Sequence, residues 1–151
     1  MTLQIEAAVY AAILRNGEEA YPDEGAGLLL GKVDGDRKSV TAVLPLSNKR
    51  EDLARRNRYL LAPEDYLRGE QEAERLGLEV LGIFHSHPDH PDRPSEFDRE
   101  WAMPWFSYLI TCVLAGKAAG SRSWRLTEDR SAFLEETLNV TQQEMVAQGP
   151  Q

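Results

Sequence analysis

The feature that most constrains the fold of this chain is a largely apolar segment, residues 78–84 (LEVLGIF), that runs directly into His85-Ser86-His87. A short run of this kind is typical of a buried β-strand, and Gly77 supplies a turn residue before it. Side chains on a strand point to alternate faces, so the two histidines are expected to share one face. Their backbone positions would lie about 7 Å apart, since a strand rises ~3.3 Å per residue, and both rings can then lean onto one ion.

The segments before this strand predict a helix and a hairpin. Apolar residues recur at three- and four-residue intervals near the start of the chain, which predicts a first helix over residues 3–16. An apolar strand is expected over residues 25–33. The Asp34-Gly35 dipeptide then favours a tight turn into a second strand, over residues 40–44.

The segments after the hairpin alternate between helices and strands. Pro63 and Gly77 stand where helices commonly begin and stop, and Ser95 is a residue type favoured at a helix N-cap. The further predictions are a surface loop at 47–57, an extended stretch at 58–61, helices at 63–77 and 95–102, a strand at 108–114, an edge strand at 124–126, and an edge strand or a last helix at 132–140. This alternation, with one antiparallel hairpin, predicts an α/β fold in which a mixed β-sheet is flanked by helices.

Length and charge limit the class of protein. The chain has 151 residues, the usual size of one compact domain, so we expect a single domain over residues 1–140 and a polar, flexible tail over residues 141–151. The net charge of −8 argues against a nucleic-acid partner. No apolar run approaches the ~18 residues that span a bilayer, and Cys112, the single cysteine, cannot form an internal disulfide. We therefore expect a cytoplasmic protein with no membrane partner.

The loop after the two histidines leads to a third candidate metal ligand. Residues 88–94 contain three prolines, which predicts a stiff loop that turns back over the histidines. Ser95 and Asp98 follow, three residues apart on the first turn of the expected helix, so they share a face. Two histidines and a carboxylate are an ordinary zinc ligand set, and three protein ligands leave the fourth position open to water. Glu24, at the mouth of the expected strand over residues 25–33, is a candidate general base.

Taken together, these separated elements resemble one known family. Glu24 with the glycines of EGAGLLLG, then His85-Ser86-His87-Pro88, then Ser95 and Asp98 in PSEFD, resemble the JAMM (MPN-plus) metallopeptidases of the Mov34/MPN/PAD-1 group. The family's pattern is His-x-His, ten residues and Asp, with a serine three residues before the aspartate. The resemblance covers residues 4–136 and is to the compact bacterial type.

The resemblance implies a cytidine-deaminase-like (JAB1/MPN) fold and one zinc ion per chain, held by His85, His87 and Asp98. It implies that Glu24 accepts the proton of the attacking water and that Ser95 donates a hydrogen bond to the oxyanion. The reaction would be hydrolysis of a peptide or isopeptide bond. The expected substrate is a ubiquitin-like sulfur-carrier protein of the ThiS/MoaD type, cut after its Gly-Gly tail, with the tail bound as an added strand at a sheet edge.

Several of these residues also have a plainer interpretation. Ser95 taken alone is equally well an N-cap, and Glu24 taken alone is equally well a solvated carboxylate at a strand end. His90 lies in the loop but outside the motif, so we interpret it as an exposed histidine. Trp101 and Trp105 fit either the core or the wall of a substrate cleft.

Three other functions compete with a peptidase. A non-catalytic MPN-type scaffold would typically lack one or more of the metal ligands, and this chain keeps all of them. A zinc deaminase needs His-x-Glu and Pro-Cys-x-x-Cys, which a chain with one cysteine cannot supply. A two-histidine phosphoesterase needs a second His-x-His element, and the three histidines of this chain, at positions 85, 87 and 90, contain only one.

Overall fold

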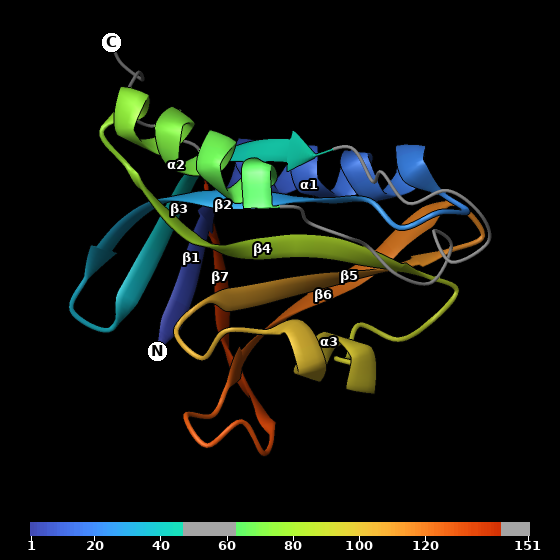
Figure 1. Cartoon of the computed structure of the whole chain (residues 1–151). Helices are drawn as coiled ribbons and strands as arrows, with labels where there is room; N and C mark the ends of the chain where they lie inside the picture. Colours follow the sequence, from blue (N-terminus) through green and yellow to red (C-terminus); the bar gives the residue numbers. More distant parts are fainter. Residues whose placement is uncertain (47–62, 143–151) are drawn as a thin grey trace, which may run out of the picture.

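In the computed structural model, which describes residues 1–46 and 63–142, the strands form one mixed sheet that closes into a barrel (Figure 1). The strands are β1 (Thr2–Glu6), β2 (Ala26–Asp34), β3 (Arg37–Leu46), β4 (Glu79–Pro88), β5 (Ser107–Leu114), β6 (Lys117–Leu126) and β7 (Phe133–Thr141), and the helices are α1 (Ala7–Ala20), α2 (Pro63–Leu76) and α3 (Glu96–Trp101). The sheet order is β1-β3-β2-β4-β5-β6-β7. Strand β1 runs parallel to β3 and β7, and β4 runs parallel to β5, while the other pairs are antiparallel. The predicted mixed β-sheet flanked by helices is confirmed.

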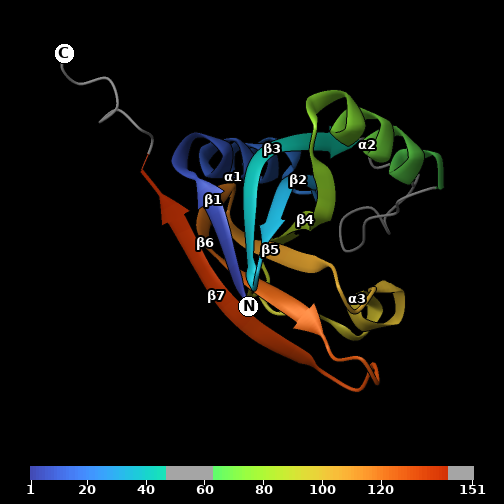
Figure 2. The same cartoon turned by 90° about the vertical axis from the view of Figure 1, so that its left-hand side faces the viewer.

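The two long helices cover different parts of the sheet (Figure 2). Helix α1 packs against β1, β3, β4, β5, β6 and β7, and its Ile13 shares a core with Leu29 and Phe84. Helix α2 packs against β2 and β4, where its Ala73 joins a second core with Ile83. Strand β4 contributes to both cores and is buried continuously from Leu81 to Pro88. No helix in the described part of the chain has the length and apolar content needed to cross a bilayer.

The beginning of the chain is a strand where the sequence predicted a helix. The prediction of a helix over residues 3–16 is wrong at its start, because β1 occupies Thr2–Glu6 and α1 runs from Ala7 to Ala20. Leu3 and Ile5 follow the two-residue period of a strand and are fully buried. Ile5 fits both the strand period and the helix period, which concealed the strand. The pairing of β1 with β3 and β7 closes the barrel.

The last two strands are not edge strands. Strand β6 begins at Lys117, well before the predicted residue 124, and pairs with β5 and β7. Strand β7 pairs with β6 and β1, so the prediction of edge strands is wrong, and so is the alternative of a last helix over residues 132–140. Closure of the sheet through β1 supplies the neighbour that the sequence could not reveal.

The central elements agree with the sequence. Gly35 makes the predicted hairpin turn with a φ of 65°, and Gly77 ends α2 with a φ of 72°, both in the left-handed region that glycine favours. The predicted strands over 25–33, 40–44, 78–84 and 108–114 and the helices over 63–77 and 95–102 are confirmed, although β4 continues past residue 84 to Pro88. The predicted loop at 47–57, the stretch at 58–61 and tail residues 143–151 lie outside the described residues.

One buried lysine gives the fold a testable response to pH. The Lys38 Nζ donates to Ser107 Oγ at 3.0 Å and to the Trp105 carbonyl at 2.5 Å. Burial lowers the pKa of Lys38 from 10.5 to about 8; Glu136 opposes this shift and Arg125 adds to it. Because the folded pKa is the lower one, the unfolded chain binds more protons between these two pH values. The free energy of unfolding contributed by Lys38 is therefore expected to rise across this window.

Substitution Lys38→Met isolates this effect, because methionine fills similar space and does not titrate. Urea denaturation of both proteins at about pH 7 and about pH 10 gives the change in the free energy of unfolding for each. The wild type is expected to gain stability relative to the variant as the pH rises. Parallel pH dependences in the two proteins would show that Lys38 keeps its ordinary pKa.

Candidate metal centre

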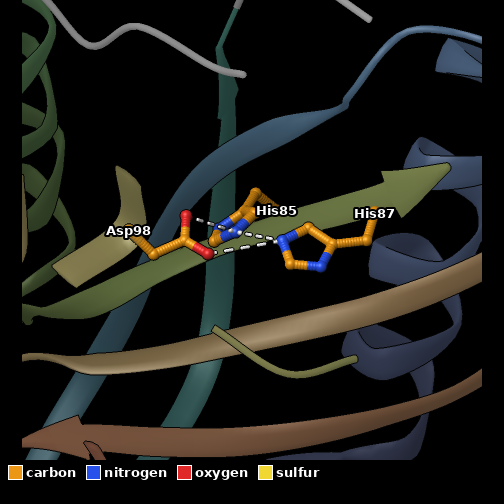
Figure 3. Close-up of side chains that lie close together, drawn as sticks. All are labelled: His85, His87 and Asp98. Atoms are coloured by element: carbon orange, nitrogen blue, oxygen red, sulfur yellow. Dashed lines mark hydrogen bonds and ion pairs between the residues drawn. The ribbon is translucent and has the colours of Figure 1, made fainter. Parts of the chain in front are cut away.

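Strand β4 and helix α3 bring two histidines and one aspartate together (Figure 3). The Nε2 atoms of His85 and His87 are 3.2 Å apart, and the ring centroids are 5.0 Å apart. Asp98, on the first turn of α3, places Oδ1 at 3.3 Å from His85 Nε2 and Oδ2 at 3.4 Å from His87 Nε2. All three side chains are buried. The two rings therefore lean toward one point that the carboxylate also faces.

The separations between these atoms fit a zinc ion. Zinc bonds of about 2.0–2.1 Å to nitrogen and oxygen put neighbouring ligand atoms about 3.3–3.4 Å apart in a tetrahedron. The observed separations of 3.2, 3.3 and 3.4 Å match this spacing. Within residues 1–46 and 63–142, His85, His87 and Asp98 are the group of metal-ligating side chains whose atoms lie within 4.8 Å of one another. Imidazole and carboxylate are ordinary zinc ligands, so the donor set fits the ion.

The loop after β4 fixes the orientation of one ring. His87 Nδ1 lies 2.8 Å from the Pro91 carbonyl oxygen, which can only accept a hydrogen bond. Nδ1 therefore carries the proton, and the Nε2 lone pair faces His85 and Asp98. The loop is held in turn by the Trp124 indole, which donates to the Asp92 carbonyl at 3.0 Å. Sequence reasoning missed the Pro91 carbonyl, because a backbone acceptor has no residue signature.

The charges of the site favour a bound cation. Burial lowers the pKa of His85, which favours the neutral imidazole that binds metals. Burial alone would raise the pKa of Asp98, but His85, His87 and the Ser95 backbone N–H hold that pKa well below its ordinary value. At neutral pH the site therefore presents an ionised carboxylate beside an uncharged ring.

Ser95 and Asp98 form the N-terminal cap of α3. The Asp98 backbone N–H donates to Ser95 Oγ at 3.1 Å, and the Ser95 N–H donates to Asp98 Oδ2 at 2.7 Å. The N-cap interpretation of Ser95 is confirmed, and this reciprocal cap fixes the orientation of the Asp98 carboxylate. Ser95 Oγ acts as an acceptor in the cap, so its hydroxyl proton remains for a second partner.

Glu24 lies in the segment just before β2, beside the strand that carries the histidines. Ala26 is paired with His85, and the Ser86 backbone N–H donates to the Gly25 carbonyl at 3.0 Å. Glu24 is only 5% exposed, so the interpretation as a solvated strand-end carboxylate is wrong. Glu24 is thus a buried carboxylate two residues from a strand pair that includes His85.

The other aromatic and histidine candidates are exposed to solvent. His90 is exposed, as predicted. Trp101 and Trp105 are 65% and 52% exposed, so neither belongs to the core. Trp105 instead lines a groove of about 490 Å³ between α2 and the start of β4, together with Tyr66 and Phe106.

Fold and site together define a class: α/β proteins whose mixed sheet carries a buried His-His-Asp group with the spacing of a zinc site. Residues 6–127 match the family described as prokaryotic homologs of the JAB domain, and the chain belongs to this family. The recognition of a JAMM/MPN relationship from the motif is confirmed.

Curated relatives match part of the chain. A desampylase of Haloferax volcanii is 39% identical over 90 residues, which cover 59% of this chain and 62% of the relative. A probable TtuB-protein conjugate cleaving protease of Thermus thermophilus is 37% identical over 87 residues, 56% of this chain and 54% of that protein. The matched region thus spans between half and two thirds of the length of these relatives.

Solved structures match nearly all of this chain. A protein from Desulfitobacterium hafniense has a TM-score of 0.82 at 28% identity, with 99% of both chains covered. A protein from Salinibacter ruber has a TM-score of 0.72 at 38% identity, with 91% of both chains covered. A JAB1/MPN domain protein from Archaeoglobus fulgidus has a TM-score of 0.56 at 20% identity, covering 90% of this chain and 98% of that one, and shows the shared fold.

Proposed function

We propose that this chain is a zinc-dependent peptidase or isopeptidase that cuts after the Gly-Gly tail of a ubiquitin-like sulfur-carrier protein of the ThiS/MoaD type. The observation that carries the proposal is the convergence of His85, His87 and Asp98 at zinc-ligand separations, beside the buried Glu24. The relatives named for desampylation and for cleaving TtuB conjugates support the substrate class. We also propose that the fold is of the cytidine-deaminase-like type.

Each residue has a distinct role in the proposed reaction. His85, His87 and Asp98 hold one Zn²⁺, which when bound supplies a Lewis acid that polarises the scissile carbonyl and lowers the pKa of water to about 7. Glu24 accepts a proton from the attacking water and passes it to the leaving amine nitrogen. The Ser95 hydroxyl donates a hydrogen bond to the oxyanion that develops on the carbonyl oxygen.

The closed sheet limits how a substrate tail can bind. Strand β1 pairs only with residues 37–40 of β3, so among the described residues the rest of β3 is paired on its β2 side alone. A strand added there would lie beyond β3 and β2, about 14 Å from β4 at ~4.8 Å per strand. A tail bound there would have to pass β3 and β2 before its scissile bond reached His85. The proposal therefore keeps the Gly-Gly tail as substrate, and the added strand stays a prediction.

Charge and cysteine content support a protein substrate and a cytoplasmic location. A net charge of −8 disfavours nucleic acid as a partner and leaves a protein substrate as the proposed one. Cys112 is a free thiol, which fits the reducing cytoplasm.

A carrier fusion tests the proposal directly. A ThiS/MoaD-type protein whose Gly-Gly tail is followed by a reporter peptide is expected to be cut after the second glycine by the zinc-loaded protein. A chelator should stop the cleavage, and added zinc should restore it. Mass spectrometry of the products locates the scissile bond, and a matched fusion ending in Ala-Ala is expected to resist cleavage.

The outcomes separate the candidate functions. Metal-dependent cleavage at another bond would reject the carrier as substrate while keeping the peptidase. Complete resistance of peptide and isopeptide fusions, with zinc bound, would favour the alternative of a non-catalytic MPN-type scaffold.

A further inference from the structure

Ser86, the residue between the two histidines, faces the opposite side of β4 from the metal centre. Its neighbour on that side is α1, where a Cβ placed on Gly17 would lie 3.1 Å from Ser86 Cβ. Phe84 shares this face and packs in the core that contains Ile13 of α1. Ser86 is 3% exposed, so its hydroxyl must find its partners within the protein.

The partner of this hydroxyl is the peptide that joins Glu24 to Gly25. The Gly25 backbone N–H donates to Ser86 Oγ at 2.8 Å, and the Ser86 backbone N–H donates to the Gly25 carbonyl at 3.0 Å. Strand β2 begins only at Ala26, so these two bonds continue the contact with β4 beyond the end of the strand. Both are made by one residue that lies between the candidate metal ligands.

The first of these bonds acts directly on Glu24. The peptide bond is planar, so the Gly25 nitrogen and the Glu24 Cα belong to one rigid unit. Helix α1 limits this unit from the other side, because a Cβ on Gly25 would overlap Asn16 Oδ1. We propose that Ser86 is a positioning residue, whose hydroxyl sets the place of the Glu24 carboxylate relative to His85 and His87. This inference rests on the proposed function and deepens it.

The other end of the Glu24 segment, at Tyr21, is hydrogen-bonded to the residue that follows β4. The Tyr21 hydroxyl donates to Asp89 Oδ2 at 2.5 Å, and Asp89 Oδ1 accepts the Ala115 N–H at 2.9 Å. Asp89 follows β4 directly. This tie is exposed to solvent and lies three residues from Glu24, so its removal is expected to matter less. Tyr21→Phe is therefore the matched control, since it also deletes one hydroxyl.

Substitution Ser86→Ala is expected to lower kcat about 10- to 100-fold, the range seen when a supporting contact of a metal site is lost. KM and the zinc content should stay near those of the wild type, because neither histidine is touched. Tyr21→Phe is expected to lower kcat less than Ser86→Ala does. A general structural defect in Ser86→Ala would lower kcat equally in the wild type and in a Glu24→Gln background. If Ser86 instead acts through Glu24, Ser86→Ala should cause almost no further loss of kcat in the Glu24→Gln background.

Amide exchange measures the same contact without any turnover. In Ser86→Ala, the Gly25 N–H loses its acceptor, so its hydrogen-exchange rate in NMR spectra is expected to rise about tenfold, with or without zinc. An unchanged Gly25 rate would overturn the proposal. So would a loss of zinc in step with kcat, or a full additional loss of kcat in the Glu24→Gln background. If the wild type cleaves no carrier, the proposed function fails, whereas Gly25 exchange still decides whether Ser86 holds this peptide.

Discussion

Replacing Glu24 by glutamine is expected to lower kcat by about 10²- to 10⁴-fold, the contribution typical of a general base. Glutamine keeps the shape of the buried side chain but cannot accept the proton of the attacking water. Because Glu24 stands outside the group of candidate ligands, the zinc content should remain at one ion per chain. Single-turnover cleavage of the carrier fusion, together with zinc analysis of the same sample, measures both quantities.

The matched control for this prediction is Glu19→Gln. Glu19 is an exposed residue of α1, and the substitution makes the same chemical change away from the site. Its kcat should equal that of the wild type. Loss of zinc in Glu24→Gln would instead make Glu24 a ligand or a structural residue, and undiminished turnover would remove it from the mechanism.

Replacing Asp98 is expected to abolish cleavage by removing the metal. The carboxylate supplies the only negative charge among the three candidate ligands, and it faces both Nε2 atoms. Zinc affinity should fall by more than about 100-fold, beyond the loss caused by an outer contact. Competition with a chromophoric chelator measures this affinity.

Two variants separate the charge of Asp98 from its role as a helix cap. Asp98→Ala removes both, whereas Asp98→Asn keeps an oxygen that can accept the Ser95 N–H. Both are expected to lose zinc. Wild-type affinity in Asp98→Asn would show that the negative charge is not needed. Asp92→Asn serves as the control. Asp92 lies in the loop between β4 and α3 and pairs with Arg122 rather than with the histidines.

The site was more predictable than the sheet because its spacing is local. Two residues on a strand share a face, and a serine three residues before an aspartate forms a cap at a helix start, so both relations follow from geometry alone. His85, His87 and Asp98 therefore converge as expected. The resemblance added Glu24, whose burial no local pattern reveals. Ser86 was overlooked because a residue facing away from the ligands has no evident role until its partner, the Gly25 N–H, is known.

The parts of the sheet that sequence reasoning missed depend on distant pairing. Strand β1 is short, and its partners on β3 and β7 lie far along the chain, so only the assembled barrel distinguishes it from the start of a helix. The predicted strand over residues 78–84 ended too early for another reason, although the shared face of His85 and His87 was inferred from strand geometry. His-Ser-His is polar and does not resemble a buried strand, yet the segment is buried to Pro88 because its polar groups contact one another and the neighbouring loop.

The cap of α3 gives Asp98 two tasks, and this sharing links metal supply to local order. The oxygen that accepts the Ser95 N–H is also the one that faces His87. A helix of only six residues has little stability of its own, so it persists through such contacts. An ion bound at this oxygen would therefore hold the first turn of α3 as well as the two histidines, so zinc binding is expected to slow amide exchange in that turn.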